Sequence, residues 1–355
     1  MKSGKQHSIH YQAGFSLVEI LVGLVIGLLA TLVIMQVFTV FEGQKRTTTG
    51  SADAQTNGSI ALYTLGRELQ MAGYTLLPVT DSPLECTAVS FGATGITDIS
   101  PVTITDGGAA AGASDSISIR YGNSPSGGVP TQITGVGLPG ANDVTVDNNL
   151  GCQVGDITLI TNGNACALSN ATAASGVTAV TLADNTGAIV SANLSCLGAW
   201  TVALFRVNPN YDPVDPANSQ AYLERNGAPS VADIVNIQAQ YGVSASSGSN
   251  LVTQWVDATG SWAAGAITVA DRNRIKALHI AVVARNGLLE KDIVTSTCTT
   301  DKGTVNNGPC AWDDTNVDAA PKIDLSNDPN WQYYRYRVFE TIIPLRNVIW
   351  SRDTL

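Results

Sequence analysis

One long apolar segment near the amino end constrains the fold more than any other feature of the sequence. Residues 15–41 hold a single charged side chain, that of Glu19. A helix needs about 20 apolar residues to cross the hydrocarbon core of a bilayer, and this segment supplies them. Because an ionised carboxylate in hydrocarbon costs roughly 2.5–3.5 kcal/mol, an acid in this place is expected to have a function and a partner. The segment therefore predicts a membrane helix with Glu19 as a functional residue.

Three interpretations of residues 1–41 differ in how they explain that acid. A cleaved secretory signal has an apolar region of about 7–15 residues, which is shorter than the one found here. A plain membrane anchor explains the length but leaves Glu19 unexplained, unless the acid merely reaches to the edge of the bilayer. In the third interpretation, residues 1–14 form a short polar leader that ends at Gly14 and exposes Phe15 as the new amino terminus.

The third interpretation rests on the segment GFSLVE, residues 14–19, followed by the long span. This arrangement resembles the class III leader of type IV prepilins and pseudopilins. The resemblance implies that a membrane peptidase cuts between Gly14 and Phe15 and that Phe15 is the site of N-methylation. It further implies that Glu19 sets subunit register, by pairing with the new amine of a neighbouring subunit in a filament. At low dielectric such a pair attracts by several kcal/mol, which offsets the desolvation of the acid.

A helical pattern continues beyond the span, with small and apolar residues on one narrow face. These residues are Ala54, Gly58, Ala61, Leu65, Leu69 and Ala72. One helix of roughly 55 residues is expected between Phe15 and Gly73, because glycine suits the left-handed position that ends helices. A bend is expected near Gly43 or Gly50. Within the span, Gly23, Gly27 and Thr31 recur every four residues, which fits either close helix packing or ordinary tolerance of glycine in membranes.

Four further segments resemble the PilW family of minor pilins. They are NGSIALYTLGRELQMAGY (57–74), DIVNIQAQYGV (233–243), RIKALHIAVVARNG (274–287) and YYRYRVFETIIPLRN (333–347). With the leader, they cover about a third of the chain, whereas residues 80–225 resemble no family that we can name. The resemblance implies a lollipop pilin, in which a globular head sits on the helical stalk, and the unmatched part is where individual specificity is expected.

The head is predicted to be β-rich. Alternating segments predict strands at 115–122, 142–149, 155–163, 177–182 and 200–207. Because no helical pattern lies between them, antiparallel pairing is expected. Three later strands, near 237–243, 278–284 and 334–338, are expected to form the sheet that lies on the stalk, the first of them with one wet face. A polar loop is predicted at 313–330.

The predicted fold class is α+β, a long amino-terminal helix packed on an antiparallel β-sheet head with an enlarged β-rich insertion. The predicted parts are a leader at 1–14, a transmembrane helix at 15–41, an extracytoplasmic amphipathic half of the stalk at 42–73, a variable β-rich part at 74–230 and a pilin-like carboxyl-terminal sheet at 231–355.

The six cysteines all follow the apolar span and indicate an oxidising compartment. They are Cys86, Cys152, Cys166, Cys196, Cys298 and Cys310. Six cysteines allow fifteen pairings, and the sequence alone does not choose among them. Short loops favour Cys152–Cys166 and Cys298–Cys310, which leaves Cys86 with Cys196. Buried free thiols are the alternative. Bridges would place the head outside the cytoplasm.

Few residues of the chain are suited to catalysis. His7 and His10 belong to the predicted leader, and His279 lies alone in a predicted strand, where a structural role is expected. Asp314, Asn316 and Asp318 begin like a calcium loop, but the sixth position is Ala319 and the twelfth is not glutamate, so a solvated acidic loop is the simpler interpretation. The aromatic cluster at 331–336 fits a sheet core better than a contact surface. No enzyme activity, metal or cofactor is predicted, and the net charge of −10 argues against binding nucleic acid.

The sequence therefore predicts a structural minor pilin that helps to prime type IV pilus assembly at or near the tip. The expected partners are the major pilin, other minor pilins, the prepilin peptidase and methyltransferase, the inner-membrane assembly platform and a tip adhesin. Before assembly the protein is expected in the bacterial inner membrane with a periplasmic head, and afterwards in the pilus at the cell surface. Two alternatives are a minor pseudopilin of a type II secretion system and a membrane-anchored adhesin that never enters a filament.

Overall fold

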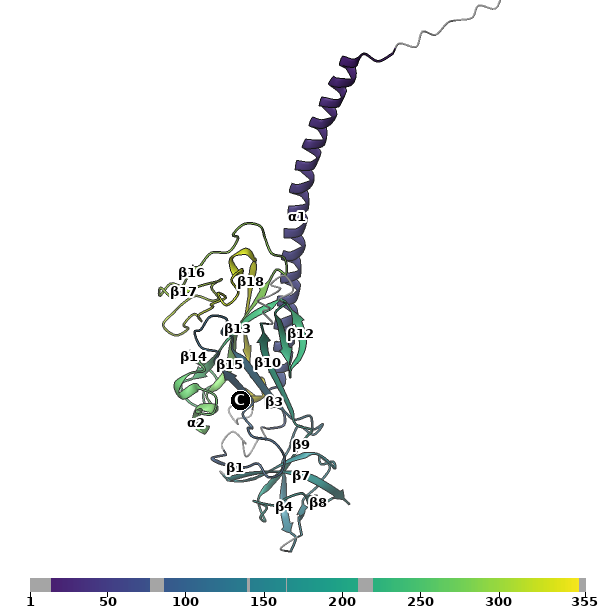
Figure 1. The fold of residues 1–355 in the computed structure, drawn as a ribbon. Coiled ribbons are helices and arrows are strands. Elements are labelled where there is room, and N and C mark those ends of the chain that lie inside the picture. The colour runs from purple at the N-terminus through teal and green to yellow at the C-terminus, as the bar shows by residue number, and fades with distance from the viewer. Residues whose placement is uncertain (1–13, 77–85, 139–140, 164, 210–219, 351–355) are drawn as a thin grey trace, which may run out of the picture. The chain divides into compact units, whose positions relative to one another are not determined.

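The computed structural model describes residues 14–76, 86–138, 141–163, 165–209 and 220–350. The chain divides into two units, residues 1–50 and residues 51–355. Helix α1 (Leu17–Met71) contributes to both (Figure 1). Its bounds agree with the helix predicted between Phe15 and Gly73. The expected bend near Gly43 or Gly50 falls around the boundary between the units and stays a prediction.

In the second unit, the predicted narrow face of α1 is buried. Ala54 is 2% exposed, while Ala61, Leu65 and Leu69 are fully buried. The glycine on this face, Gly58, is equally tightly packed, because a Cβ atom there would overlap the ring of Phe339. The spacing of small and apolar residues therefore predicts correctly which side of this part of α1 faces the core.

The helix ends as its sequence predicts. Gly73 adopts a φ of 73°, which a residue with a side chain rarely tolerates. Its N–H donates to the carbonyl of Arg120 over 2.8 Å. This bond ties the end of the helix to a strand of the head.

A four-stranded antiparallel sheet packs against that buried face of α1. Its strands, in spatial order, are β14 (Val252–Asp257), β13 (Ile234–Ser244), β15 (Ile275–Arg285) and β18 (Tyr336–Pro344). Ile237, Tyr241, Leu278 and Ile280 are fully buried in one core with the helix. The three later strands predicted to form a sheet on the stalk are β13, β15 and β18, so this prediction is confirmed.

A five-stranded antiparallel sheet closes the same core. Its order is β12 (Ala228–Ala232), β11 (Tyr222–Arg225), β10 (Thr201–Asn208), β3 (Ser116–Tyr121) and β2 (Val102–Thr105). Ile117, Phe205 and Leu223 from its three central strands are fully buried with the helix and the four-stranded sheet. The core of the second unit is therefore built by strands from both the variable and the pilin-like part of the predicted head.

A third sheet closes on itself into a small barrel at one end of the second unit (Figure 1). Its order is β1 (Ala88–Ser90), β7 (Ala165–Ser175), β6 (Ile157–Asn162), β9 (Asn193–Gly198), β4 (Thr131–Val136), β5 (Asp143–Val146) and β8 (Ala179–Leu182), and β8 pairs again with β7. The barrel has its own apolar core around Ile133, Val180 and Leu194. The pairing of β7 with β8 closes a ring of six strands, whereas β1 stays outside the ring as an edge strand.

The strand predictions for this region are partly right. The five predicted segments are strands β3, β5, β6, β8 and β10. The expectation of antiparallel pairing holds for all strand pairs except β1 and β7, which run parallel. Strands β1, β2, β4, β7 and β9 are not among the predicted segments. Strand β7 is rich in alanine, serine and asparagine and shows no clear alternation.

Two of the three predicted disulfide pairings are wrong. The bridges join Cys86 with Cys166, Cys152 with Cys196 and Cys298 with Cys310, at Cα–Cα distances of 5.7, 5.2 and 5.7 Å. Only Cys298–Cys310 is as predicted, although all six cysteines do form bridges. Short loops favour Cys152–Cys166, but the order of the strands in the sheet determines which cysteines lie close enough to pair. Strand β1 lies beside the start of β7, which brings Cys86 to Cys166 instead.

The remaining short elements complete the head. They are η3 (Gly260–Trp262), α2 (Val269–Arg272), β16 (Cys298–Thr299), β17 (Val305–Asn306), η4 (Trp331–Tyr333) and α3 (Arg346–Trp350). Strands β16 and β17 pair with each other and lie within the long connection from β15 to β18. We call this connection, residues 286–335, the cover segment.

Candidate functional site

The predicted processing segment stands at the start of α1. Gly14 and Phe15 precede the helix, Phe15 is 79% exposed, and no other part of the described chain lies within 4 Å of a Cβ atom built on Gly14. Glu19 lies in the first helical turn, where an acid complements the positive end of the helix dipole. Among the described residues, none forms a side-chain hydrogen bond or ion pair with the Glu19 carboxylate. The structure is that of the uncut chain, so cleavage at Gly14 and Phe15, methylation of Phe15 and the role of Glu19 stay predictions.

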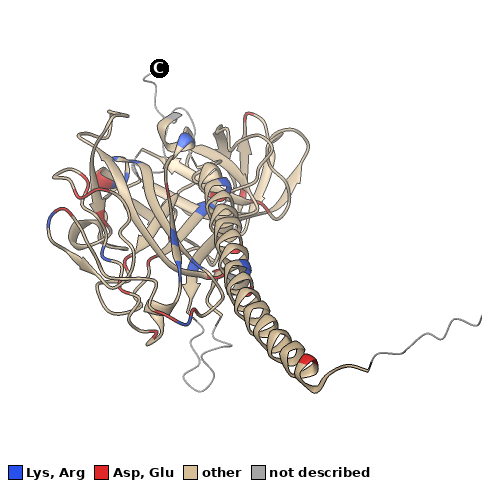
Figure 2. Cartoon of the chain, turned by 90° about the horizontal axis from the view of Figure 1, so that it is seen from above, with Lys and Arg blue, Asp and Glu red and all other residues tan. Residues whose placement is uncertain are grey.

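The first unit presents an apolar surface with nothing packed on it. Every large apolar side chain from Leu17 to Phe41 is at least 48% exposed. The helix is long and apolar enough to cross a membrane, by length and composition. Figure 2 shows how few charged residues interrupt this part of α1. Since such a surface is not stable in water, it requires lipid or other apolar helices around it. With the leader motif described above, this makes the chain a membrane-anchored protein.

The second half of α1 also carries a polar anchor that the sequence analysis misses. Glu68 is 8% exposed, accepts a hydrogen bond from the Tyr121 hydroxyl over 2.7 Å and pairs with Arg225 over 3.0 Å. These partners come from β3 and β11 of the five-stranded sheet. Glu68 lies in the quoted segment 57–74, but its partners lie far away in the sequence, so no local pattern indicates them.

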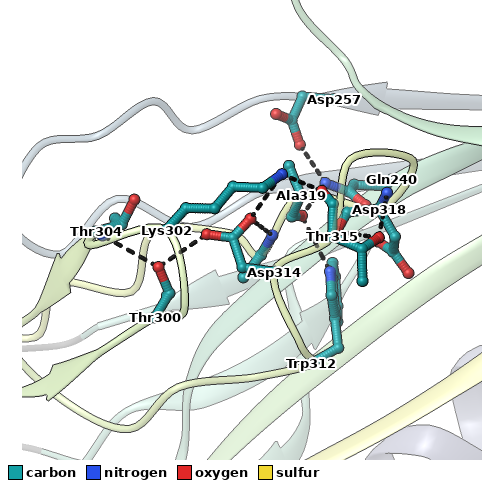
Figure 3. Close-up of polar contacts among 11 residues, drawn as sticks. Gln240, Asp257, Thr300, Lys302, Thr304, Trp312, Asp314, Thr315, Asp318 and Ala319 are labelled. Atoms are coloured by element: carbon teal, nitrogen blue, oxygen red, sulfur yellow. Dashed lines mark hydrogen bonds and ion pairs between the residues drawn. The ribbon is translucent and has the colours of Figure 1, made fainter.

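The cover segment buries the outer face of the four-stranded sheet. Gln240, predicted on a wet face, is 1% exposed; its side-chain N–H groups donate to Asp257 and to the carbonyl of Ala319, each over 2.7 Å (Figure 3). The backbone N–H of Trp255 donates to the carbonyl of Val317 over 2.8 Å. The expectation of a wet face on this strand is therefore wrong, because residues some 75 positions later in the chain lie over it.

His279 lies beneath this cover segment and is 6% exposed. Its ring stacks on Trp312 with centroids 3.8 Å apart, and Nδ1 lies 3.3 Å from an oxygen of Asp318. Burial lowers the pKa of His279 to about 4, so the ring is neutral at pH 7. Burial, with the nearby charges of Glu340 and Asp257, raises the pKa of Asp318 to about 6. The expected structural role of His279 agrees with this packing.

The acidic loop residues do not gather into one site. The Asp314 carboxylate accepts from the Thr300 hydroxyl over 2.8 Å and lies 3.5 Å from Lys302 (Figure 3). Asp318 faces His279 instead, and Asn316 is exposed. Among the described residues, no three histidine, cysteine or acidic side chains are grouped so that they could hold a metal ion. In this structure the loop holds the cover segment on the four-stranded sheet, through the contacts of Ala319 with Gln240 and of Asp318 with His279.

Comparison with known families agrees with the resemblance seen in the sequence. Residues 201–347 match the family model of Type IV Pilus-assembly protein W, and residues 9–35 match that of the prokaryotic N-terminal methylation motif, of which residues 9–13 lie outside the described part. The first match covers less than half of the chain and includes β10 to β15 and β18. No curated protein and no solved structure matches the chain.

Proposed function

Because the chain is a PilW-like type IV minor pilin with a prepilin methylation motif at its amino end, we propose that it helps to prime pilus assembly at or near the tip. In this proposal it is cut after Gly14, methylated at Phe15 and held in the inner membrane with its head in the periplasm. It then enters the filament with other minor pilins and the major pilin. Its role is structural rather than enzymatic.

The observation that carries this proposal is the contrast between the apolar half of α1 and its single acid. The side chains from Leu17 to Phe41 have no partner in the described chain, whereas a bundle of similar helices would bury them. In such a bundle Glu19 needs a positive partner. Cutting after Gly14 creates an amine on Phe15, four residues and about one helical turn away. The amine on Phe15 of one subunit can therefore form an ion pair with the Glu19 carboxylate of the next.

The head supplies what is individual to this pilin. The closed barrel lies in residues 86–200, outside the PilW match, and in residues 121–200 there is no lysine or arginine. The PilW-like sheets, by contrast, hold the second half of α1. We infer that the matched part builds the base of the head on the stalk, and that the barrel faces other pilins, the assembly platform or a tip adhesin.

The experiment for this proposal uses a deletion strain complemented with the wild-type chain, Glu19→Ala or Glu290→Ala. Glu290 is a surface acid of the cover segment that pairs with Arg335, so its substitution is a matched loss of one carboxylate. We expect deletion to reduce surface pili, Glu290→Ala to restore them and Glu19→Ala to leave the protein in the membrane but out of sheared filaments.

Two outcomes favour the alternatives. Normal pili with lost secretion of exoproteins would indicate a minor pseudopilin of a type II secretion system. A protein that stays in the membrane uncut, with normal pili, would indicate an anchored adhesin that never joins a filament. Either outcome contradicts the proposal.

A further inference from the structure

A cavity of about 430 Å³ lies at the junction between the barrel and the five-stranded sheet. Its walls come from the loop that joins β1 to β2, from β3, from the turn before β6 and from the start of β10. A volume of this size falls in the range of about 300–1,000 Å³ typical of small-molecule sites. It is therefore large enough for one small ligand.

One wall of the cavity is aromatic. Trp200, between β9 and β10, lines the cavity and is half-buried against the apolar cluster that includes Leu159, Leu168 and Leu197. This packing fixes the indole ring in place. The indole nitrogen is buried and has no hydrogen-bond partner among the described residues, which is unusual for a tryptophan in a folded protein.

Another part of the lining is polar and held in position. The Asp98 carboxylate accepts from the backbone N–H of Ser100 over 2.8 Å and from the Thr103 hydroxyl over 3.2 Å, and it pairs with Arg120 over 3.2 Å. Arg120 also donates to the Thr103 hydroxyl over 2.8 Å. The Asp98 side chain is nevertheless 33% exposed, so its oxygens can accept further hydrogen bonds. A polar group oriented before binding loses little entropy when a ligand arrives.

The charges of the cavity indicate the class of ligand. Asp98 and Arg120 are the two charged residues among those that line it, and they neutralise each other. A phosphate or nucleotide would find no free cation there. The combination that remains is an aromatic face, a carboxylate that accepts hydrogen bonds and exposed glycine and threonine backbone. A pyranose ring matches it, because such a ring has one apolar C–H face and hydroxyl donors around its rim.

We propose that this cavity binds a neutral saccharide, with one sugar ring against Trp200 and its hydroxyls donating to Asp98. All the lining residues except Val202 lie outside the PilW match, in the part of the chain expected to hold individual specificity. The proposal goes beyond filament assembly and does not depend on it. A pilin that carries this site would recognise glycan while it also builds the filament.

The test uses the full chain in phosphatidylcholine nanodiscs, without detergents that carry sugar headgroups. The probes are four neutral sugars, methyl galactoside, methyl mannoside, methyl glucoside and N-acetylglucosamine, and one charged sugar for comparison, N-acetylneuraminic acid. Binding is followed by saturation-transfer NMR and by tryptophan fluorescence. We expect at least one neutral sugar to bind, and Trp200→Ala to weaken that binding at least about tenfold.

A second variant covers the case in which Trp200→Ala disturbs folding. Val202 is 43% exposed, lines the cavity and lies directly across from Arg120 on β3, so Val202→Trp fills the cavity from a surface position. Val136→Trp is the matched control, because Val136 is 38% exposed on β4 and lines no part of the cavity. We expect at least a tenfold loss of binding for Val202→Trp and none for Val136→Trp.

Three results would overturn the proposal. They are the absence of binding for all four neutral sugars, an equal effect of the two tryptophan substitutions, and binding of N-acetylneuraminic acid in place of the neutral sugars. None of these results bears on cleavage after Gly14 or on filament assembly, so the two proposals fail separately.

Discussion

The two halves of α1 differ in the burial of their apolar side chains, which are buried in the second unit and exposed in the first. In the second unit, Leu65 and Leu69 are fully buried against two sheets of the same chain. In the first unit, Leu24 is 63% exposed and Leu28 is 57% exposed, although both halves are equally helical. The difference shows that the apolar side chains of the first half need partners outside the chain, whereas those of the second half pack against the head.

The acids of the two units extend this comparison. Asp115, at 4% exposure, accepts hydrogen bonds from the backbone N–H groups of Gly107 and Ala239 over 2.9 and 2.8 Å. Glu19 makes no such contact with any described residue and lies in an apolar surface. A carboxylate in apolar surroundings needs a partner. Asp115 finds its partners in its own chain, and we infer that Glu19 finds one in its neighbour.

The largest expected effect is on the free energy of unfolding when one leucine in each half of α1 is replaced by alanine. Leu65→Ala removes a fully buried side chain and should lower the free energy of unfolding of the head by about 2–5 kcal/mol. Leu24→Ala should change it by less than about 0.5 kcal/mol, because Leu24 packs on nothing in the described chain. Urea unfolding of the full chain in nanodiscs, followed by tryptophan fluorescence, measures both. Equal losses would contradict the comparison.

A smaller effect is expected when one glycine in each half gains a methyl group. Gly58→Ala places its Cβ atom in the Phe339 ring and should destabilise the head by about 1–3 kcal/mol, partly offset by the better helix propensity of alanine. Gly27→Ala meets nothing within 4 Å and should leave the head unchanged. The midpoint of thermal unfolding is the measurement. Stabilisation by Gly58→Ala would mean that the helix is not packed on β18 as described.

The last expected effect concerns pH, and its direction is the test. Burial raises the pKa of Asp115 to about 7, above its ordinary value of 3.8. The unfolded chain therefore loses this proton first, so the contribution of Asp115 is present in full below about pH 3.8 and is lost as the pH rises to about 7. We expect the stability of the wild type relative to Asp115→Asn to fall over that window and to stay flat above it. Urea unfolding of both proteins at pH 4.5, 6 and 8 checks this, and a rise with pH would contradict it.

Sequence reasoning succeeds here where the determinants are local. The buried face of α1 follows from a helical spacing that a single element displays, and the helix stop follows from Gly73 alone. The five predicted strands alternate visibly between apolar and polar residues. The predicted site residues Gly14, Phe15 and Glu19 also rest on one contiguous motif, which lies within the match at residues 9–35, but their roles stay predictions.

Sequence reasoning fails where distant segments decide the outcome. Cys166 pairs with Cys86 because β1 lies beside β7, and strand order is not visible in cysteine spacing. Gln240 alternates as on a wet face, yet Ala319 of the cover segment lies over it. The cavity beside Trp200 is assembled from several separate segments, so no motif indicates it. These features all depend on tertiary contacts that the individual segments do not encode.

The central claim is that the amino end of α1 is made for assembly after cleavage, and the mature amino terminus tests it most directly. Intact-mass spectrometry and peptide sequencing should be applied to the protein isolated from membranes of a strain with an active prepilin peptidase. The account predicts a chain that begins at Phe15 and carries a methyl group on its amine. A chain that still contains residues 1–14 would contradict it.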